Sequence, residues 1–257
     1  MQDFFANCAT VLQKYGFSYL RGAGTTLLLA LVGTFFGCLI GFAVGALQTI
    51  PVDKQRDPVW KRVLLKILHI FLRCYVELFR GTPMIVQAVF IYYGLLQVFG
   101  IKMGMWQAGF FIVSINTGAY MAEIVRGGII SIDRGQFEGA MSIGMTHAMT
   151  MFKVIIPQVM RNILPSVSNE FVINIKDTSV LNVIGVTELY YFAGIIKRQN
   201  FQTFQTYLVV CILYFILTFT VTRLLRWVER KLDGNENYTI FGSQTDVNAE
   251  IHITKEG

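Results

Sequence analysis

Charged residues are scarce in this sequence. Asp, Glu, Lys and Arg make up 15% of its 257 residues, whereas about 25% of a soluble globular domain is charged. Hydrophobic residues make up 54%, and they gather in blocks of the roughly 20 residues that a helix needs to cross a bilayer. An ordinary soluble domain is therefore excluded, and an all-α membrane protein with several spans is expected.

Sequence signatures of metal binding, catalysis and nucleotide binding are also lacking. Cysteines are few, far apart and without a CxxC pair, so neither a zinc site nor a disulfide framework is expected: Cys8, Cys38, Cys74 and Cys211. His69 and His147 each stand alone, which favours a surface or packing role. We find no glycine-rich phosphate loop and no set of nucleophile, acid and base. The chain is therefore not expected to be an enzyme or to bind a cofactor itself.

Five membrane spans are expected, at about residues 23–48, 59–99, 106–130, 165–187 and 204–227. The apolar block after Arg21 is too long for the core of a cleaved signal peptide, so it is interpreted as a retained span. The second block should begin as an amphipathic helix and bend at Gly81-Thr82-Pro83, because proline disfavours helix at the residue before it.

Three further regions complete the expected domain organisation. Residues 1–22 should lie at the membrane interface, and residues 23–231 should form the membrane domain, with a loop at 131–164. Residues 188–203 are expected to be an outer connection, and residues 232–257 a polar, loosely ordered tail.

Basic residues set the expected orientation. They concentrate in residues 51–66, in the 131–164 loop and just after the last span, and such loops face the cytoplasm. The N-terminus is therefore expected outside and the C-terminus inside. This distribution also explains the net charge of +6 without nucleic-acid binding.

The first span carries glycine at every fourth residue, at Gly33, Gly37, Gly41 and Gly45. This spacing puts the four on one helix face, where another backbone can approach closely. The partner could be a helix of the same subunit or of a second subunit, and the pattern favours neither.

The loop at 131–164 predicts a short helix, a turn and a second short helix. Asp133 is a good N-cap, and Gln136 completes a capping box. Pro157 and Pro165 should each break the chain's helical pattern. Two four-residue repeats would give the helix a small-residue face and a methionine stripe: Ala140, Gly144 and Ala148, and Met141, Met145 and Met149. From the pattern alone, an amphipathic pair packed on its own membrane domain is equally possible.

This loop resembles the cytoplasmic loop of ABC importer permeases. That pattern is Glu-Ala-Ala, three residues, Gly, nine residues and Ile-x-Leu-Pro, and the chain matches its spacing with Glu138-Gly139-Ala140, Gly144 and Val154-Ile155-Ile156-Pro157. Three positions differ by small or apolar replacements, namely Gly139, Val154 and Ile156.

Other stretches resemble the polar amino-acid permeases of the histidine, glutamine, arginine and cystine type. They are Glu77 to Pro83 with Gln87 and Tyr92-Tyr93-Gly94, Asn116 to Tyr120, Ala122 to Gly128, and Asn169-Glu170-Phe171 with Lys176 to Ser179. The resemblance covers about residues 20–231.

The resemblance implies an ATP-driven importer in the bacterial inner membrane. Two permease subunits, the same or paralogous, would form the path, a dimeric ATPase would bind ATP and Mg²⁺, and an extracytoplasmic solute-binding protein would deliver a polar amino acid. The residues that would dock on the ATPase and transmit its motion are Glu138, Gly139, Ala140, Met141, Gly144, Met145 and Pro157.

Polar groups within the spans are expensive to bury, so they should pair, reach water or line a path. Glu123 and Arg126 are three residues apart and can pair. We expect four charges to serve mainly as structural or gate residues: Glu77, Arg80, Glu123 and Arg126. The better candidates for a substrate path are Asn116, Glu170, Asn174, Lys176 and Asp177.

A second interpretation is an ion-coupled secondary amino-acid carrier that works without an ATPase. Many such carriers contain two repeats of inverted topology. The two halves of this sequence show no repeat, which favours the importer mildly.

Overall fold

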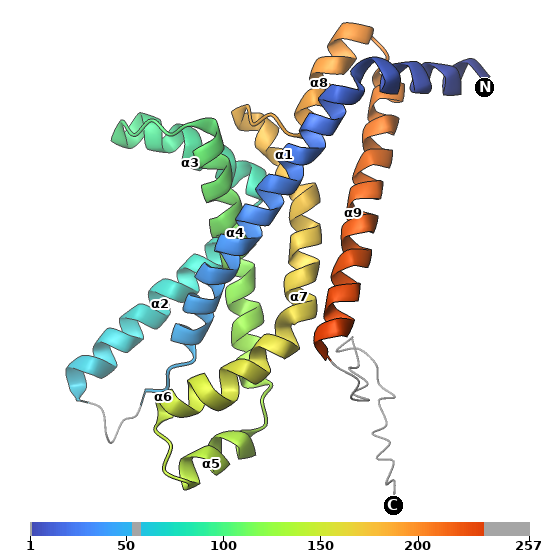
Figure 1. The fold of residues 1–257 in the computed structure, drawn as a ribbon. Coiled ribbons are helices and arrows are strands. Elements are labelled where there is room, and N and C mark those ends of the chain that lie inside the picture. The colour runs from blue at the N-terminus through green and yellow to red at the C-terminus, as the bar shows by residue number, and fades with distance from the viewer. Residues whose placement is uncertain (1, 53–57, 234–257) are drawn as a thin grey trace, which may run out of the picture.

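The computed structural model describes residues 2–52 and 58–233, and every regular element in these ranges is helical (Figure 1). The elements are α1 (Gln2–Gln48), α2 (Val59–Gly81), α3 (Met84–Phe99), α4 (Met105–Ile130), α5 (Arg134–Ser142), α6 (His147–Thr150), a π-helical turn (Met151–Ile155), α7 (Ile156–Asp177), a 3-10 helix (Thr178–Ile184), α8 (Leu189–Asn200) and α9 (Thr203–Asp233). Most of the expected polar tail lies outside the described residues.

Three of the described helices are long and apolar enough to cross a membrane: α1 over Ala6–Gln48, α4, and α9 over Thr203–Lys231. Two bent pairs could each provide one more span. These are α2 with α3, bent by 113°, and His147–Ile184 with α8, bent by 56°. The expected helical membrane fold is confirmed, while the count of five and the orientation stay predictions.

The expected bend at Gly81-Thr82-Pro83 is confirmed, since α2 ends at Gly81 and α3 begins at Met84. The Gln87 side chain stabilises the break: its amide donates to the carbonyl oxygens of Phe79 and Thr82, both at 2.9 Å. These bonds satisfy carbonyls that the interrupted helix leaves without an amide partner.

The glycine ridge of α1 packs on α4 of the same chain. Cβ atoms added at Gly33, Gly37 and Gly41 would lie 2.2, 2.6 and 2.3 Å from side-chain atoms of Val113, Thr117 and Met121. The residues contacted on α4 also recur every fourth position, so the two helices mesh along a shared stripe. The sequence left open whether this ridge packs on a helix of the same subunit or of a second subunit. In the structure it packs on a helix of the same subunit.

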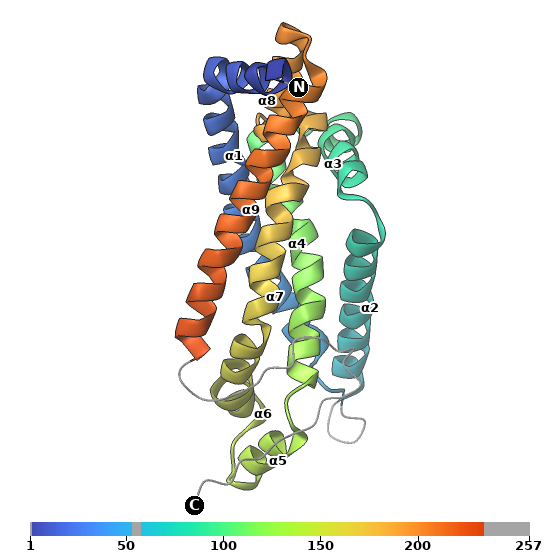
Figure 2. The same cartoon turned by 90° about the vertical axis from the view of Figure 1, so that its right-hand side faces the viewer.

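The expectation that Pro165 breaks the helix is wrong. Pro165 lies inside α7, and Pro157 sits in its first turn, where a missing amide costs little because the first four amides of a helix have no partner. The expected outer connection contains α8. Its N-cap is the buried Glu188, whose carboxylate accepts from the amides of Tyr190 (2.7 Å) and Tyr191 (2.6 Å). Helix α1 begins at Gln2 and continues into the first span, and its N-terminal part turns across the end of the bundle (Figures 1 and 2).

The helical bundle has two distinct ends. Helices α9, α7 and α4 run side by side, with α2 on the far side of α4 (Figure 2). Helices α5 and α6 stand at the same end as the start of α2 and the end of α9, whereas α3, α8 and the N-terminus gather at the other end (Figures 1 and 2). The segments expected in the cytoplasm therefore share one end of the molecule.

Candidate functional site

Helix α5 projects beyond the bundle, at the end that the basic segments share (Figures 1 and 2). Asp133 is its N-cap, as expected, and accepts from the Gly135 amide at 2.6 Å. Thr146 caps α6 and accepts from the Met149 amide at 3.3 Å. Local capping thus fixes both short helices even though few other elements touch them.

Gly144 ends α5 and so breaks the expected small-residue face. Its φ of +84° is left-handed, a conformation that glycine adopts without the steric penalty of a Cβ. The Met145 amide donates to the Ala140 carbonyl (3.2 Å) and the Gly144 amide to the Met141 carbonyl (3.0 Å), which closes the helix end. The expectation that Ala140, Gly144 and Ala148 share one helix face is therefore wrong.

The expected docking residues divide by exposure. Ala140 is buried and Met145 half-buried, whereas Glu138, Gly139, Met141 and Pro157 are exposed. Glu138 Oε1 lies 3.5 Å from Nε of Arg134, one turn earlier in the helix, and both side chains are exposed. The docking residues predicted from the sequence do not include Ile143, which is 79% exposed in the α5–α6 turn.

A cleft of about 750 Å³ lies between α5, the end of α4 and the π-helical turn, and it is lined by Ile129, Ile132, Phe137, Met141 and Ile155 among others. The outer surface of α5 and this cleft together offer exposed apolar side chains beside the Glu138 carboxylate. This arrangement suits contact with another protein.

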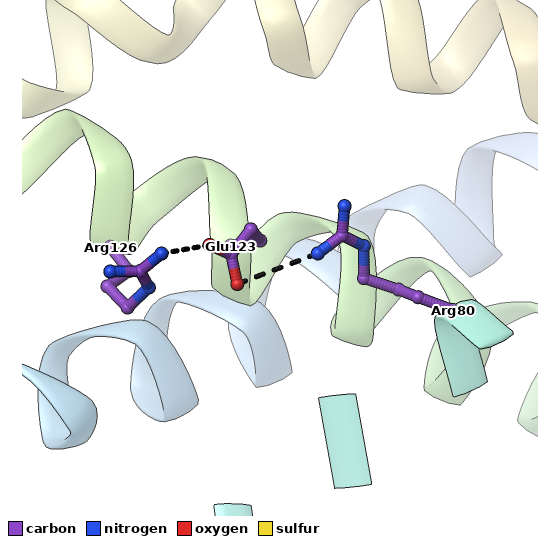
Figure 3. A network of polar contacts seen from close by, with 3 residues as sticks. All are labelled: Arg80, Glu123 and Arg126. Atoms are coloured by element: carbon purple, nitrogen blue, oxygen red, sulfur yellow. Dashed lines mark hydrogen bonds and ion pairs between the residues drawn. The ribbon is translucent and has the colours of Figure 1, made fainter. Parts of the chain in front are cut away.

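A charged cluster links α2 to α4 (Figure 3). Glu123 lies between two arginines: one carboxylate oxygen bonds to Arg126 Nη2, and the other lies 3.6 Å from Arg80 Nη1. The Arg80 guanidinium also lies over the Tyr120 ring, 5.6 Å from its centroid. The contact between Glu123 and Arg126 is present as expected.

Glu77 does not pair with Arg80, although the two are three residues apart. Arg80 turns instead to Glu123 on α4, and no ion pair of Glu77 is found among the described residues. A single carboxylate between two guanidinium groups gains from both attractions. Glu77 lines a cleft of about 520 Å³ with His69, Arg73 and the cluster.

The cluster also borders a second cleft, of about 660 Å³, which reaches α7 at Asn162 and Ser166. The two clefts share the cluster residues Arg80, Glu123 and Arg126. A change in these ion pairs would therefore alter both spaces. The described residues contain no group of His, Cys, Asp and Glu able to hold a metal ion.

The five candidate path residues lie in different surroundings. The buried Asn174 donates to Thr34 Oγ1 (2.8 Å) and Thr117 Oγ1 (2.9 Å), joining α7 to α1 and α4. Asn116 instead donates to Gln87 Oε1 at 2.9 Å, beside the α2–α3 bend.

The remaining three path candidates lie along α7. Glu170 is buried, whereas Lys176 and Asp177 are exposed at the end of the helix. The two amides thus make helix-to-helix hydrogen bonds, and only Lys176 and Asp177 are open to solvent.

Known proteins show what this arrangement is similar to. The family described as binding-protein-dependent transport system inner membrane component matches residues 60–234. A probable amino-acid ABC transporter permease, PatM of Vibrio harveyi, is 34% identical, with 83% of this chain and 91% of that protein aligned. The glutamine transport system permease GlnP of Escherichia coli K12 is 33% identical, with 83% of this chain and 92% of that protein aligned.

Solved structures show the same relation. One solved relative is a chain from the crystal structure of an amino acid ABC transporter with histidines. This chain superposes on it with a TM-score of 0.75 at 36% sequence identity, and the superposition covers 86% of this chain and 96% of that one. A chain of the inward-facing MetNI methionine ABC transporter gives a TM-score of 0.62 at 20% identity, and the superposition covers 84% of this chain and 99% of that one. At that identity the second comparison concerns the fold alone.

Proposed function

The chain belongs to the family of binding-protein-dependent transport system inner membrane components, and from this premise we propose that it imports polar amino acids as one of two permease subunits. It is a multi-pass inner-membrane permease of the ABC type, a transport subunit and not an enzyme. The observation that carries the substrate class is the alignment with amino-acid permeases over more than nine-tenths of their length. This membership disfavours the secondary carrier.

The proposed partners follow from the family. A dimeric ATPase binds ATP and Mg²⁺ and docks on α5 and α6 of each permease, and an extracytoplasmic binding protein delivers the amino acid at the opposite end. The exposed Glu138, Met141 and Ile143 at the projecting end of the bundle support this docking surface. The second permease is the same chain or a paralogue.

The charged cluster is the proposed gate. The Arg80–Glu123 contact joins α2 to α4, and the clefts on its two sides change if these helices move apart. Motion of α5 reaches the cluster by a short path, because α5 follows α4 after a three-residue connection at 131–133. ATP binding in the partner would thus alter the cluster through α4.

Co-purification tests the docking surface. The tagged chain, expressed with its partner ATPase, should retain that ATPase through affinity purification, and Glu138→Arg with Met141→Arg should release it. Arg198→Glu on α8, at the other end, is the control and should keep it. Equal retention by both variants would contradict docking on α5.

A further inference from the structure

One face of α2 is basic between Arg62 and Arg73. Arg62, Lys66, His69 and Arg73 follow one another at intervals of four, three and four residues, which aligns them on one side of a helix. His69 is held in place, since its Nε2 donates to the Leu47 carbonyl oxygen at 3.1 Å. Lys66 and Arg73 are exposed.

This basic face lines another cleft of about 520 Å³, which shares His69 and Arg73 with the cleft beside Glu77. Its described lining consists of Arg62, Lys66, His69 and Arg73 with the apolar side chains of Val52, Val59, Val63 and Ile70. None of these residues is a carboxylate. The described lining therefore combines positive charge with apolar walls, and it includes neither Glu123 nor the two arginines that Glu123 contacts.

The neighbouring face of α2 is apolar and exposed. Trp60 and Phe71 are each 69% exposed, and Ile67 is 60% exposed. The start of α2 stands away from α4, at the end where α5 and α6 lie (Figure 1). In a membrane protein, apolar side chains beside Lys and Arg near the end of the bundle match the boundary between acyl chains and headgroups.

We propose that this cleft binds one anionic phospholipid, with the headgroup phosphate at Lys66, His69 and Arg73 and an acyl chain along Ile67, Ile70 and Phe71. Basic pockets on the cytoplasmic side of membrane proteins bind anionic headgroups in this way. A second copy of the chain would bring another row of cations against the first, so charge complementarity favours the lipid. The site would make the stability and activity of the permease depend on anionic lipid.

Lipid binding to the purified chain tests the proposal. The chain, delipidated in a neutral detergent, is titrated with dioctanoyl phosphatidylglycerol, dioctanoyl phosphatidylcholine or inorganic phosphate, and the bound species are counted by native mass spectrometry. Phosphatidylglycerol should bind in a saturable 1:1 complex. The double variant Lys66→Gln/Arg73→Gln should weaken this binding about 25-fold, because each basic residue near an anionic surface contributes about fivefold.

A matched double variant controls for charge alone. Lys153→Gln/Arg161→Gln removes two exposed cations at the same end of the molecule and should change binding less than twofold. Equal binding of phosphatidylcholine would overturn headgroup recognition, and displacement by an equal concentration of inorganic phosphate would overturn a lipid as the ligand. If both double variants weakened phosphatidylglycerol binding equally, or if neither weakened it, the proposed location of the lipid site would be overturned. Size-exclusion profiles check that each variant is folded.

Discussion

The packing of α1 on α4 predicts a position-specific effect of adding a single methyl group. In Gly41→Ala the new Cβ would lie 2.3 Å from Met121 Cβ and 2.8 Å from the backbone nitrogen of Ala122. Backbone cannot swing aside as a flexible side chain can, so the helices must separate. Overpacking of this kind costs about 1–3 kcal/mol. At about 2–4 °C per kcal/mol for a chain of this size, the melting temperature should fall by roughly 2–12 °C.

Gly24 provides the matched control, since it lies in the same helix and a Cβ there would meet nothing within 4 Å. Gly24→Ala should therefore keep or raise the stability, by up to about 1 kcal/mol from helix propensity. Both variants are measured by intrinsic fluorescence during heating of the detergent-solubilised chain. Equal melting temperatures for the two alanine variants would refute the close contact of α1 and α4.

Three further substitutions, one of them with a control variant, test the remaining parts of the site. Gly144→Arg should abolish ATP-coupled uptake while membrane insertion persists, because an L-residue at a φ of +84° costs about 1–2 kcal/mol and the side chain disturbs the α5–α6 turn. Gly139→Ala, whose Cβ would meet nothing within 4 Å, should keep uptake, and equal uptake by both would count against the turn. Glu123→Gln should lower uptake yet change the unfolding free energy by less than about 1 kcal/mol, since its ion pairs are partly exposed; unchanged uptake would rule out a gate. Asn174→Ala should cost about 1–3 kcal/mol in SDS unfolding, because it leaves buried hydroxyls without a partner; unchanged stability would show that these hydrogen bonds contribute little.

Local signals predicted much of the fold. The bend at Gly81-Thr82-Pro83 and the limits of α4 follow from proline chemistry and apolar length, and both are present. The glycine ridge predicted a close helix contact. Its partner could not be predicted, because a four-residue repeat marks a face without saying which helix covers it.

The misses have two physical causes. Pro165 stays helical within α7 because neighbouring helices can hold a segment whose local hydrogen bond is missing. Gly144 was assigned to a helix face from its spacing, although glycine is also the commonest residue at a helix end. Arg80 has a nearer acidic neighbour in sequence, Glu77, yet contacts Glu123 on another helix. Tertiary packing decided the outcomes at Pro165 and Arg80, whereas a local helix end decided the outcome at Gly144.

Uptake by the reconstituted system tests the proposed function most directly. Proteoliposomes holding the chain, its ATPase and its binding protein are supplied with labelled glutamine, histidine, arginine and cystine. The proposed function predicts accumulation of at least one of these only when ATP and all three proteins are present. Accumulation by the chain alone, driven by a proton or sodium gradient, would contradict it.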